Sequence, residues 1–183
     1  MSMIERPDRP QLAVALDFLD LPRAVKVAEE AVLGGADWLE AGTPLIKSEG
    51  LESVRALRRQ YPKKTIFADM KIIDAGRIEV EAAAKAGADV VGVLGEASAA
   101  TVKECVEAAR NYGTRILADL IECSDPASRA KELEELGVHF IGVHVAIDAQ
   151  MQGKDPFALL REVAGTVDIP VGVAGGIHSE TAA

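Results

Sequence analysis

Two carboxylates and one ammonium group lie within six residues of each other at the end of an apolar segment. The segment FADMKIIDAG contains Asp69 and Lys71, followed by Asp74 on the way to the next helix. Side chains alternate along a strand, so we expect Asp69 and Lys71 to share a face. There they would neutralise each other and still offer donors and acceptors to a ligand. The alternative is a solvated loop with a chance Asp-Lys pair, and spacing alone leaves both open.

Four further ionisable residues occupy the same position, the end of an apolar segment. These residues are Asp17, Glu40, Asp119 and His144. For one aspartate alone, closing a strand with a turn is a sufficient explanation, and a lone histidine can simply pack in a core. Their repetition at equivalent points favours one shared site instead, because a buried carboxylate without a partner is costly. Histidine also titrates near neutral pH, which suits it to acid-base chemistry.

A repeat of about 50 residues sets these positions. The segments LAVALD, TIFAD and RILAD end at Asp17, Asp69 and Asp119, which are 52 and 50 residues apart. IPVGVAGG reaches the matching point at Gly175. A second series, GGADWLEAG, KAGADVVGVLG and LGVHFIGVH, lies between them, each with a glycine before apolar β-formers. The pattern predicts seven strands: 12–17, 37–41, 65–69, 89–94, 115–120, 139–144 and 170–174.

Amphipathic segments separate these strands and predict helices on the outside of a parallel sheet. We therefore expect one α/β domain over residues 1–183, a (β/α)8 TIM barrel that lacks its last βα unit, preceded by an N-terminal arm over residues 1–10. The last segment, GGIHSETAA, predicts a helix that begins with Ser179 as its N-cap. A doubly wound sheet is the alternative, but it usually carries a glycine-rich turn after the first strand, and ALDFLDLP has no glycine.

The composition narrows the function classes. The chain has 183 residues and a formal net charge of −9, with no basic stripe of the kind that nucleic-acid binders need. No apolar run approaches the 18 residues or so of a membrane span, and the charged N-terminus does not predict a signal peptide. Cys105 and Cys123 predict no disulfide framework, so we expect reduced thiols in a cytoplasmic protein.

The spacing Asp-x-Lys-x-x-Asp, here Asp69, Lys71 and Asp74, resembles the signature of the orotidine 5′-monophosphate decarboxylase suprafamily. The blocks LAVALD, LEAGTPLIKSEG, ADMKIIDAG, ILADLI and VHVAIDAQ occur in the order typical of its sugar-phosphate branch. They are most similar to the 3-hexulose-6-phosphate synthases, and the resemblance runs from Leu12 to Gly176.

The resemblance implies roles for the residues at the strand ends. Glu40 and Asp69 match residues that hold Mg²⁺, which agrees with the preference of that ion for hard oxygen ligands. Asp17 matches a residue that hydrogen-bonds substrate hydroxyls, and Lys71 matches one near the reacting oxygen.

The remaining matches concern acid-base chemistry, the subunit interface and the phosphate group. Asp119 and His144 match acid/base positions, and which of them is the base stays open. Members pair as homodimers, and the residue that matches Asp74 enters the neighbouring subunit's site. Gly175 and Gly176 match the first half of a phosphate grip, while the Gly-Arg pair of its second half is absent.

The resemblance implies a Mg²⁺-dependent, reversible condensation of formaldehyde with ribulose 5-phosphate that gives a hexulose 6-phosphate. One alternative is a 3-keto-L-gulonate 6-phosphate decarboxylase, in which arginine and glutamate replace Ile147 and Asp119. Both departures favour the synthase. A second alternative is an inactive barrel that only binds sugar phosphate, because the eighth βα unit is absent.

Overall fold

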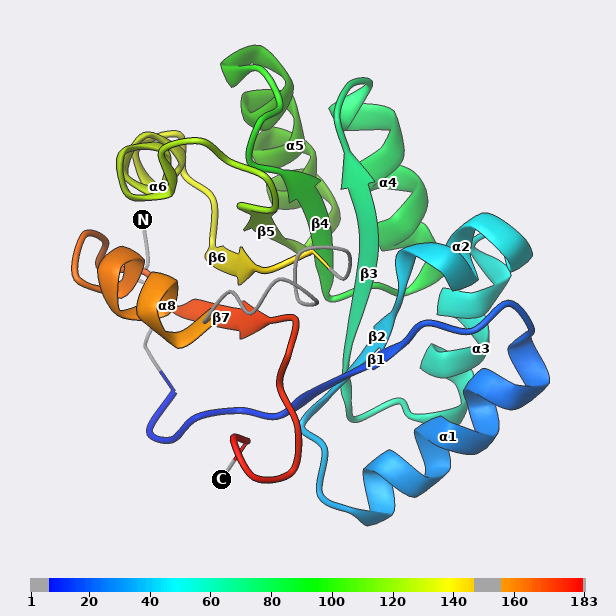
Figure 1. The fold of residues 1–183 in the computed structure, drawn as a ribbon. Helices are drawn as coiled ribbons and strands as arrows, with labels where there is room; N and C mark the ends of the chain where they lie inside the picture. Colours follow the sequence, from blue (N-terminus) through cyan, green and yellow to red (C-terminus); the bar gives the residue numbers. More distant parts are fainter. Residues whose placement is uncertain (1–6, 147–155, 183) are drawn as a thin grey trace.

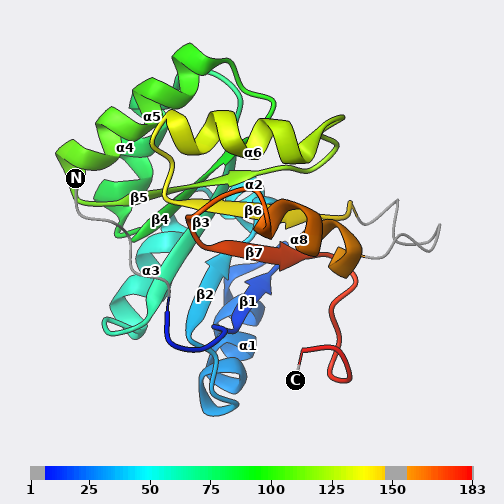
Figure 2. The same cartoon turned by 90° about the vertical axis from the view of Figure 1, so that its left-hand side faces the viewer.

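The sheet is a single layer of parallel strands that curls around an inner face, with helices on its outer side (Figures 1 and 2). This computed structural model describes residues 7–146 and 156–182. The strands are β1 (Ala13–Leu16), β2 (Trp38–Ala41), β3 (Thr65–Ile72), β4 (Val90–Leu94), β5 (Arg115–Asp119), β6 (Phe140–His144) and β7 (Val171–Ala174). They pair in sequence order from β1 to β7, and every pair is parallel. The seven predicted strands are confirmed, although β3 continues to Ile72.

The helices alternate with the strands as predicted. They are α1 (Leu21–Leu33), α2 (Thr43–Glu49), α3 (Glu52–Gln60), α4 (Gly76–Ala86), α5 (Ala99–Tyr112), α6 (Pro126–Glu135) and α8 (Pro156–Ala164). Polar caps start several of them: the Asp20 side chain accepts from the Arg23 N–H in α1, and the Asp125 side chain accepts from the Ser128 N–H in α6. None of the helices within the described ranges is both long and apolar enough to cross a bilayer.

One helix was not predicted, and one predicted helix is wrong. Helix α2 is only seven residues long and follows β2 directly. The segment after Ser179 forms no helix up to residue 182; the backbone N–H groups of Thr181 and Ala182 both donate to the His178 carbonyl, which makes a turn.

Both faces of the sheet are apolar, which explains the near-continuous apolar runs of the strands. The outward-facing side chains pack against the helices and are fully buried, among them Leu16, Leu39 and Ile66. Inward-facing side chains form a second cluster, which closes the end of the curled sheet at which the strands begin. Its members are Trp38, Phe67, Val90, Leu117 and Phe140.

The curl stops short of a closed ring. No strand of the described residues lies between β1 and β7, and their inward-facing Ala15, Gly172 and Ala174 are exposed. The part of the chain that the structure describes therefore forms a TIM-barrel-like half-barrel without an eighth βα unit, as the repeat predicted. The single-domain assignment and the arm over residues 1–10 stay predictions, although Arg9 at the end of that arm pairs with Asp37 just before β2.

Candidate functional site

A bulge in β3 brings Asp69 and Lys71 together. Ala68 pairs with Val91 and Ile72 with Val93, so four steps of β3 lie opposite two steps of β4. Lys71 takes up the excess with a left-handed backbone, φ 47°. The two side chains meet as predicted. The predicted cause, regular alternation of side chains along the strand, was wrong, because β3 is bulged at this point.

A chain of hydrogen bonds runs from Asp69 across the sheet to His144. The Lys71 ammonium donates to Oδ2 of Asp69 and to Oδ2 of Asp119, both at 2.9 Å. Nδ1 of His144 lies 2.9 Å from the same Oδ2 of Asp119. Because the residues come from the ends of β3, β5 and β6, the curl of the sheet brings the predicted site residues into one group.

The hydrogen bonds and charges around Asp119 determine which ring nitrogen of His144 donates to it. Burial alone would raise the pKa of Asp119, but the bonds and charges of His144 and Lys71 outweigh it and lower that pKa. Its other oxygen accepts from the Ile121 N–H at 2.9 Å. An ionised carboxylate only accepts hydrogen bonds, so Nδ1 of His144 donates to Oδ2 of Asp119, and Nε2 is the ring nitrogen left to exchange a proton with a ligand.

The four side chains of the hydrogen-bonded chain differ in solvent exposure. The Asp69 and Asp119 side chains are only 9% and 7% exposed, whereas those of Lys71 and His144 are each 24% exposed. Burial alone would lower the pKa of Lys71, but the charges of Asp69 and Asp119 raise it, so the lysine stays cationic. Of these four side chains, the ammonium and the imidazole are therefore the most accessible to a ligand.

Asp17 and Glu40 lie on the same inner face as Asp69. Glu40 pairs in register with Ala15 on one side and Phe67 on the other, and Asp17 and Asp69 each lie two residues further along these strands. Burial, followed by the charges of Asp69 and Asp17, raises the pKa of Glu40 to about 8. Burial and the charge of Asp69 also raise the pKa of Asp17.

The carboxylates of Glu40 and Asp69 suit a cation that takes only one or two ligands from the protein. Lys71 alone does not balance the charges around Glu40, so a divalent cation between Glu40 and Asp69 would relieve an existing repulsion. Within the described ranges, no group of three or more His, Cys, Asp or Glu side chains is placed to hold a metal ion. One or two protein carboxylates, with waters and substrate oxygens completing the shell, is the arrangement that Mg²⁺ commonly adopts.

Two glycines make room for the carboxylates. A Cβ on Gly42 would overlap the Asp17 carboxylate, and a Cβ on Gly92 would lie 3.1 Å from Oδ1 of Asp69. Any side chain at either position would push on a site carboxylate.

Thr43 belongs to this group and was not predicted. Its hydroxyl oxygen lies 2.6 Å from Oδ2 of Asp69 and 2.9 Å from the Asp69 carbonyl oxygen. A threonine before a proline predicts only a turn or helix start, so its contact with β3, 26 residues later, has no sequence signal.

Three predicted residues lie outside both the hydrogen-bonded chain and the group formed by Asp17, Glu40 and Asp69. Asp74 is exposed in the loop between β3 and α4. Gly175 and Gly176 follow β7 with φ values of 83° and 75°, a left-handed backbone that favours glycine at both positions. The resemblance gave these glycines to the phosphate and Asp74 to a neighbouring subunit, and both assignments stay predictions.

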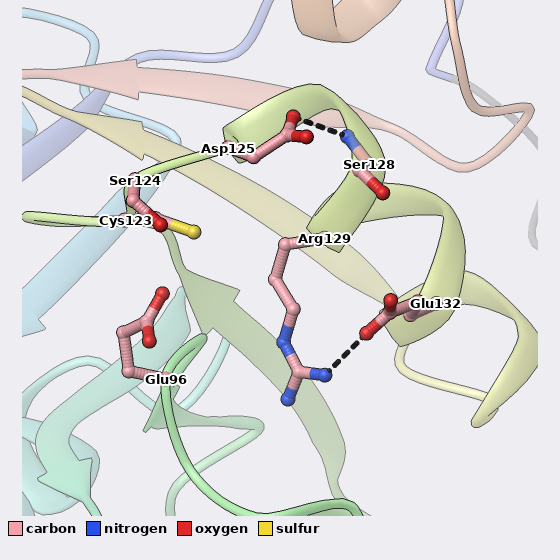
Figure 3. A pocket seen from close by; sticks show the side chains of 7 residues that line it. All are labelled: Glu96, Cys123, Ser124, Asp125, Ser128, Arg129 and Glu132. Carbon is pink, nitrogen blue, oxygen red and sulfur yellow. Dashed lines mark hydrogen bonds and ion pairs between the residues drawn. The ribbon is translucent and has the colours of Figure 1, made fainter.

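A cavity of about 320 Å³ lies between the loop after β4, the segment that follows β5, and α6 (Figure 3). It is lined by Glu96, Cys123, Ser124, Asp125, Ser128, Arg129 and Glu132. The Arg129 guanidinium donates to the carbonyls of Gly95 and Ala97 and therefore ties the loop after β4 to α6. None of the predicted site residues lines this cavity.

The remaining sequence predictions concern thiols and a specificity position. Cys105 and Cys123 are both free, and burial raises their pKa values to about 12 and about 11, so both stay neutral thiols. Ile147, which favoured the synthase over the decarboxylase, lies outside the described residues.

Comparison with known proteins agrees with this geometry. Residues 10–183 match the model of the orotidine 5′-phosphate decarboxylase / HUMPS family. A 3-hexulose-6-phosphate synthase of Methylomonas aminofaciens is 44% identical over 171 residues, which cover 93% of this chain and 81% of that protein.

Solved structures give the same result. A crystal structure of a 3-hexulose-6-phosphate synthase superimposes with a TM-score of 0.89 at 40% identity, covering 94% of this chain and 83% of that one. A 3-keto-L-gulonate-6-phosphate decarboxylase of Vibrio cholerae superimposes with a TM-score of 0.81 at 31% identity, and the match covers 93% of this chain and 80% of that one. The chain is thus an enzyme of the orotidine 5′-phosphate decarboxylase / HUMPS family, similar to its 3-hexulose-6-phosphate synthases.

Proposed function

We propose that this protein is an aldehyde-lyase that condenses formaldehyde with ribulose 5-phosphate to a hexulose 6-phosphate, reversibly. The observation that carries the proposal is the hydrogen-bonded chain from Asp69 through Lys71 and Asp119 to His144. It places a fixed cation and an imidazole on the same carboxylate oxygen of Asp119. These are the two groups needed to remove a proton beside a ketone and to hold the resulting charge.

His144 is the base in this proposal. Nε2 takes a proton from the hydroxymethyl carbon beside the ketone, and the electrons of that C–H bond form a C=C bond while the ketone oxygen becomes negative. Asp119 accepts three hydrogen bonds and has a lowered pKa, so it orients the imidazole and stabilises its protonated form rather than taking the proton itself. The Lys71 ammonium faces the developing oxyanion.

Carbon-carbon bond formation then uses the same proton. The enediolate carbon attacks formaldehyde, the ketone is restored, and the formaldehyde oxygen takes the proton back from His144. Net, one C–C bond and one O–H bond form, and one C–H bond and the C=O π bond of formaldehyde are lost. Formaldehyde has one carbon and needs no large pocket of its own.

We propose Mg²⁺ as the cofactor, held by Glu40 and Asp69, because the raised pKa of Glu40 marks a carboxylate group short of positive charge. When bound, the ion supplies Lewis acidity toward the substrate oxygens. Asp17, on the same inner face, accepts hydrogen bonds from substrate hydroxyls. The backbone N–H groups at Gly175 and Gly176 face the phosphate, which the left-handed turn supports.

The active form in this proposal is a cytoplasmic homodimer. Asp74 is exposed, and Ile73 and Ile78 of the same segment carry apolar side chains that are 52% and 71% exposed. Large apolar side chains exposed in one segment suit a protein contact better than they suit water. We propose that this loop delivers Asp74 to the neighbouring subunit's site. The cytoplasmic location is supported by the two free thiols.

Decarboxylation of 3-keto-L-gulonate 6-phosphate is the second candidate, because a decarboxylase of that name shares the fold at 31% identity. It requires a proton donor for the carbanion that remains after CO₂ is lost. Asp119 is held ionised by Lys71 and His144, so the aspartate is a poor donor, and this favours the synthase.

The test is formaldehyde consumption in the presence of ribulose 5-phosphate, measured with Mg²⁺ and with EDTA, and with product mass determined. We expect consumption that depends on both sugar and metal, with a product 30 mass units, about one formaldehyde, heavier than the sugar phosphate. Lys71→Met should lower turnover by roughly 10²–10³-fold, because it removes the cation at the oxyanion. Lys103→Met, an exposed lysine on α5, is the matched control and should turn over normally. CO₂ release from the keto-gulonate phosphate without formaldehyde consumption would replace the proposal with its alternative.

A further inference from the structure

The start of α2 carries a polar contact that the proposed chemistry leaves unexplained. Thr43 is the first residue of α2, and its hydroxyl reaches from the end of β2 to the carboxylate of Asp69 on β3. The distance of 2.6 Å to Oδ2 is in the range of an O–H···O⁻ bond, whereas the 2.9 Å contact with the Asp69 carbonyl is longer. A hydroxyl has one proton, so the short contact identifies the carboxylate as its acceptor.

This bond determines which oxygen of Asp69 is available. Oδ2 already accepts from Thr43 and from the Lys71 ammonium. Among the described residues no hydrogen bond is made by Oδ1, which lies against the inner face of β4 where Gly92 has no side chain. Two donors on one oxygen therefore fix the carboxylate plane and leave the other oxygen for a ligand.

The helix that carries Thr43 is anchored at its other end. The Ser48 hydroxyl donates to the Leu19 carbonyl, and the Glu49 carboxylate accepts from the Leu21 N–H, so α2 is tied to the loop that follows β1. A donor on a doubly anchored helix loses little entropy when it bonds to Asp69, which makes it an effective support for a functional carboxylate.

We infer that Thr43 is a positioning residue that aligns the Asp69 carboxylate, so that Oδ2 stays in the lysine-histidine chain and Oδ1 faces the ligand. The inference rests on the proposed function for the part that concerns turnover. Its geometry, however, predicts an effect on any hard cation bound at Asp69, whichever reaction the enzyme performs.

The test uses the full chain with Thr43→Val, which keeps the shape and removes the hydroxyl, and Thr43→Ser, which keeps the hydroxyl and removes the methyl group. Mn²⁺ binding, measured by electron paramagnetic resonance, serves as the metal readout that needs no turnover. The kcat and KM for ribulose 5-phosphate are measured alongside. Thr166→Val is the control, because it makes the same substitution at a hydroxyl that donates to the Val163 carbonyl and involves neither α2 nor Asp69.

We expect Thr43→Val to lower Mn²⁺ affinity and kcat by about 10- to 100-fold, the range seen when groups that orient metal ligands are removed, with KM changed less than about threefold. Thr43→Ser should restore both, and Thr166→Val should leave Mn²⁺ affinity unchanged. If Thr43→Val is not folded by circular dichroism, Thr43→Ala removes the same hydroxyl without risk of overpacking.

Two results would overturn the inference: a folded Thr43→Val or Thr43→Ala variant with wild-type Mn²⁺ affinity, or a Thr43→Ser variant as impaired as Thr43→Val, which would assign the effect to the methyl group. A wild-type protein that binds Mn²⁺ but consumes no formaldehyde would count against the proposed function alone. A wild-type protein that binds no Mn²⁺ would contradict the role given to Oδ1.

Discussion

At the scale of single residues, the pKa of a buried carboxyl group depends on the side chains beside it. Burial, followed by nearby carboxylates, raises the pKa of Glu40, whereas the lysine and histidine beside Asp119 lower the pKa of that buried carboxylate. The sequence identified both residues because each ends a strand. It left the base open between Asp119 and His144, since that choice depends on hydrogen bonds between β5 and β6, which spacing does not encode.

The two histidines of the β6 region are a further contrast. His139 precedes β6, and its Nδ1 accepts from the Ile116 N–H, so the ring is held neutral. Burial, and then the charges of Arg115 and Arg110, lower its pKa to about 4. The bond to the backbone of β5 gives this residue a structural role.

His139 should make the protein less stable in mild acid. In the unfolded chain His139 takes up a proton near pH 6.5, whereas in the folded protein the ring stays neutral until the pH nears 4. The contribution of His139 to the free energy of unfolding is therefore fully present above pH 6.5 and is lost as the pH falls toward 4. Because the ring is partly exposed, we expect a loss on the order of 1–2 kcal/mol. Urea denaturation of the wild type and His139→Gln at several pH values measures the difference, which should narrow across this window. His178→Gln, at an exposed histidine after β7, is the control. A constant difference between wild type and His139→Gln from pH 7 to 4 would contradict the assignment.

At the scale of elements, the segment from β3 to α4 is built to present one loop. Ala75 adopts φ 51° just before α4, and Gly76 lies so close to α5 that a Cβ would be 2.6 Å from the Cys105 sulfur. This contact fixes the start of α4, and the loop before it projects Asp74 with Ile73 into solvent. The motif spacing placed Asp74 on this loop correctly, but nothing in the sequence gives the left-handed Ala75.

Subunit mixing tests whether this loop serves a second copy of the chain. Asp69→Asn and Asp74→Asn should each be nearly inactive alone. If every site takes Asp69 from one subunit and Asp74 from the other, half of the dimers in an equal mixture are heterodimers with one intact site each. We expect about a quarter of the wild-type activity after the two variants are unfolded and refolded together. Mixing each variant with itself is the control. Activity that stays at the level of the separate variants, or a fully active Asp74→Asn, would place Asp74 outside the site.

At the scale of the whole molecule, the sequence predicted most of the architecture. The repeat of apolar runs ending in polar residues was sufficient for seven parallel strands and their order, because local periodicity and the βα alternation determine both. The β3 bulge, Thr43 and α2 were not predicted, since each depends on contacts between different strands. The helix expected after Ser179 does not form: its short segment follows two left-handed glycines and is mostly exposed, so little packing stabilises it.

The proton transfer assigned to His144 is open to direct measurement. Ribulose 5-phosphate in D₂O with enzyme and Mg²⁺, but without formaldehyde, is followed by ¹H NMR. We expect the signal of the hydroxymethyl carbon beside the ketone to lose intensity as deuterium enters, and His144→Asn to slow this exchange by roughly 10²–10⁴-fold. No deuterium at that carbon, or equal exchange in wild type and His144→Asn, would contradict the chemistry proposed for this site.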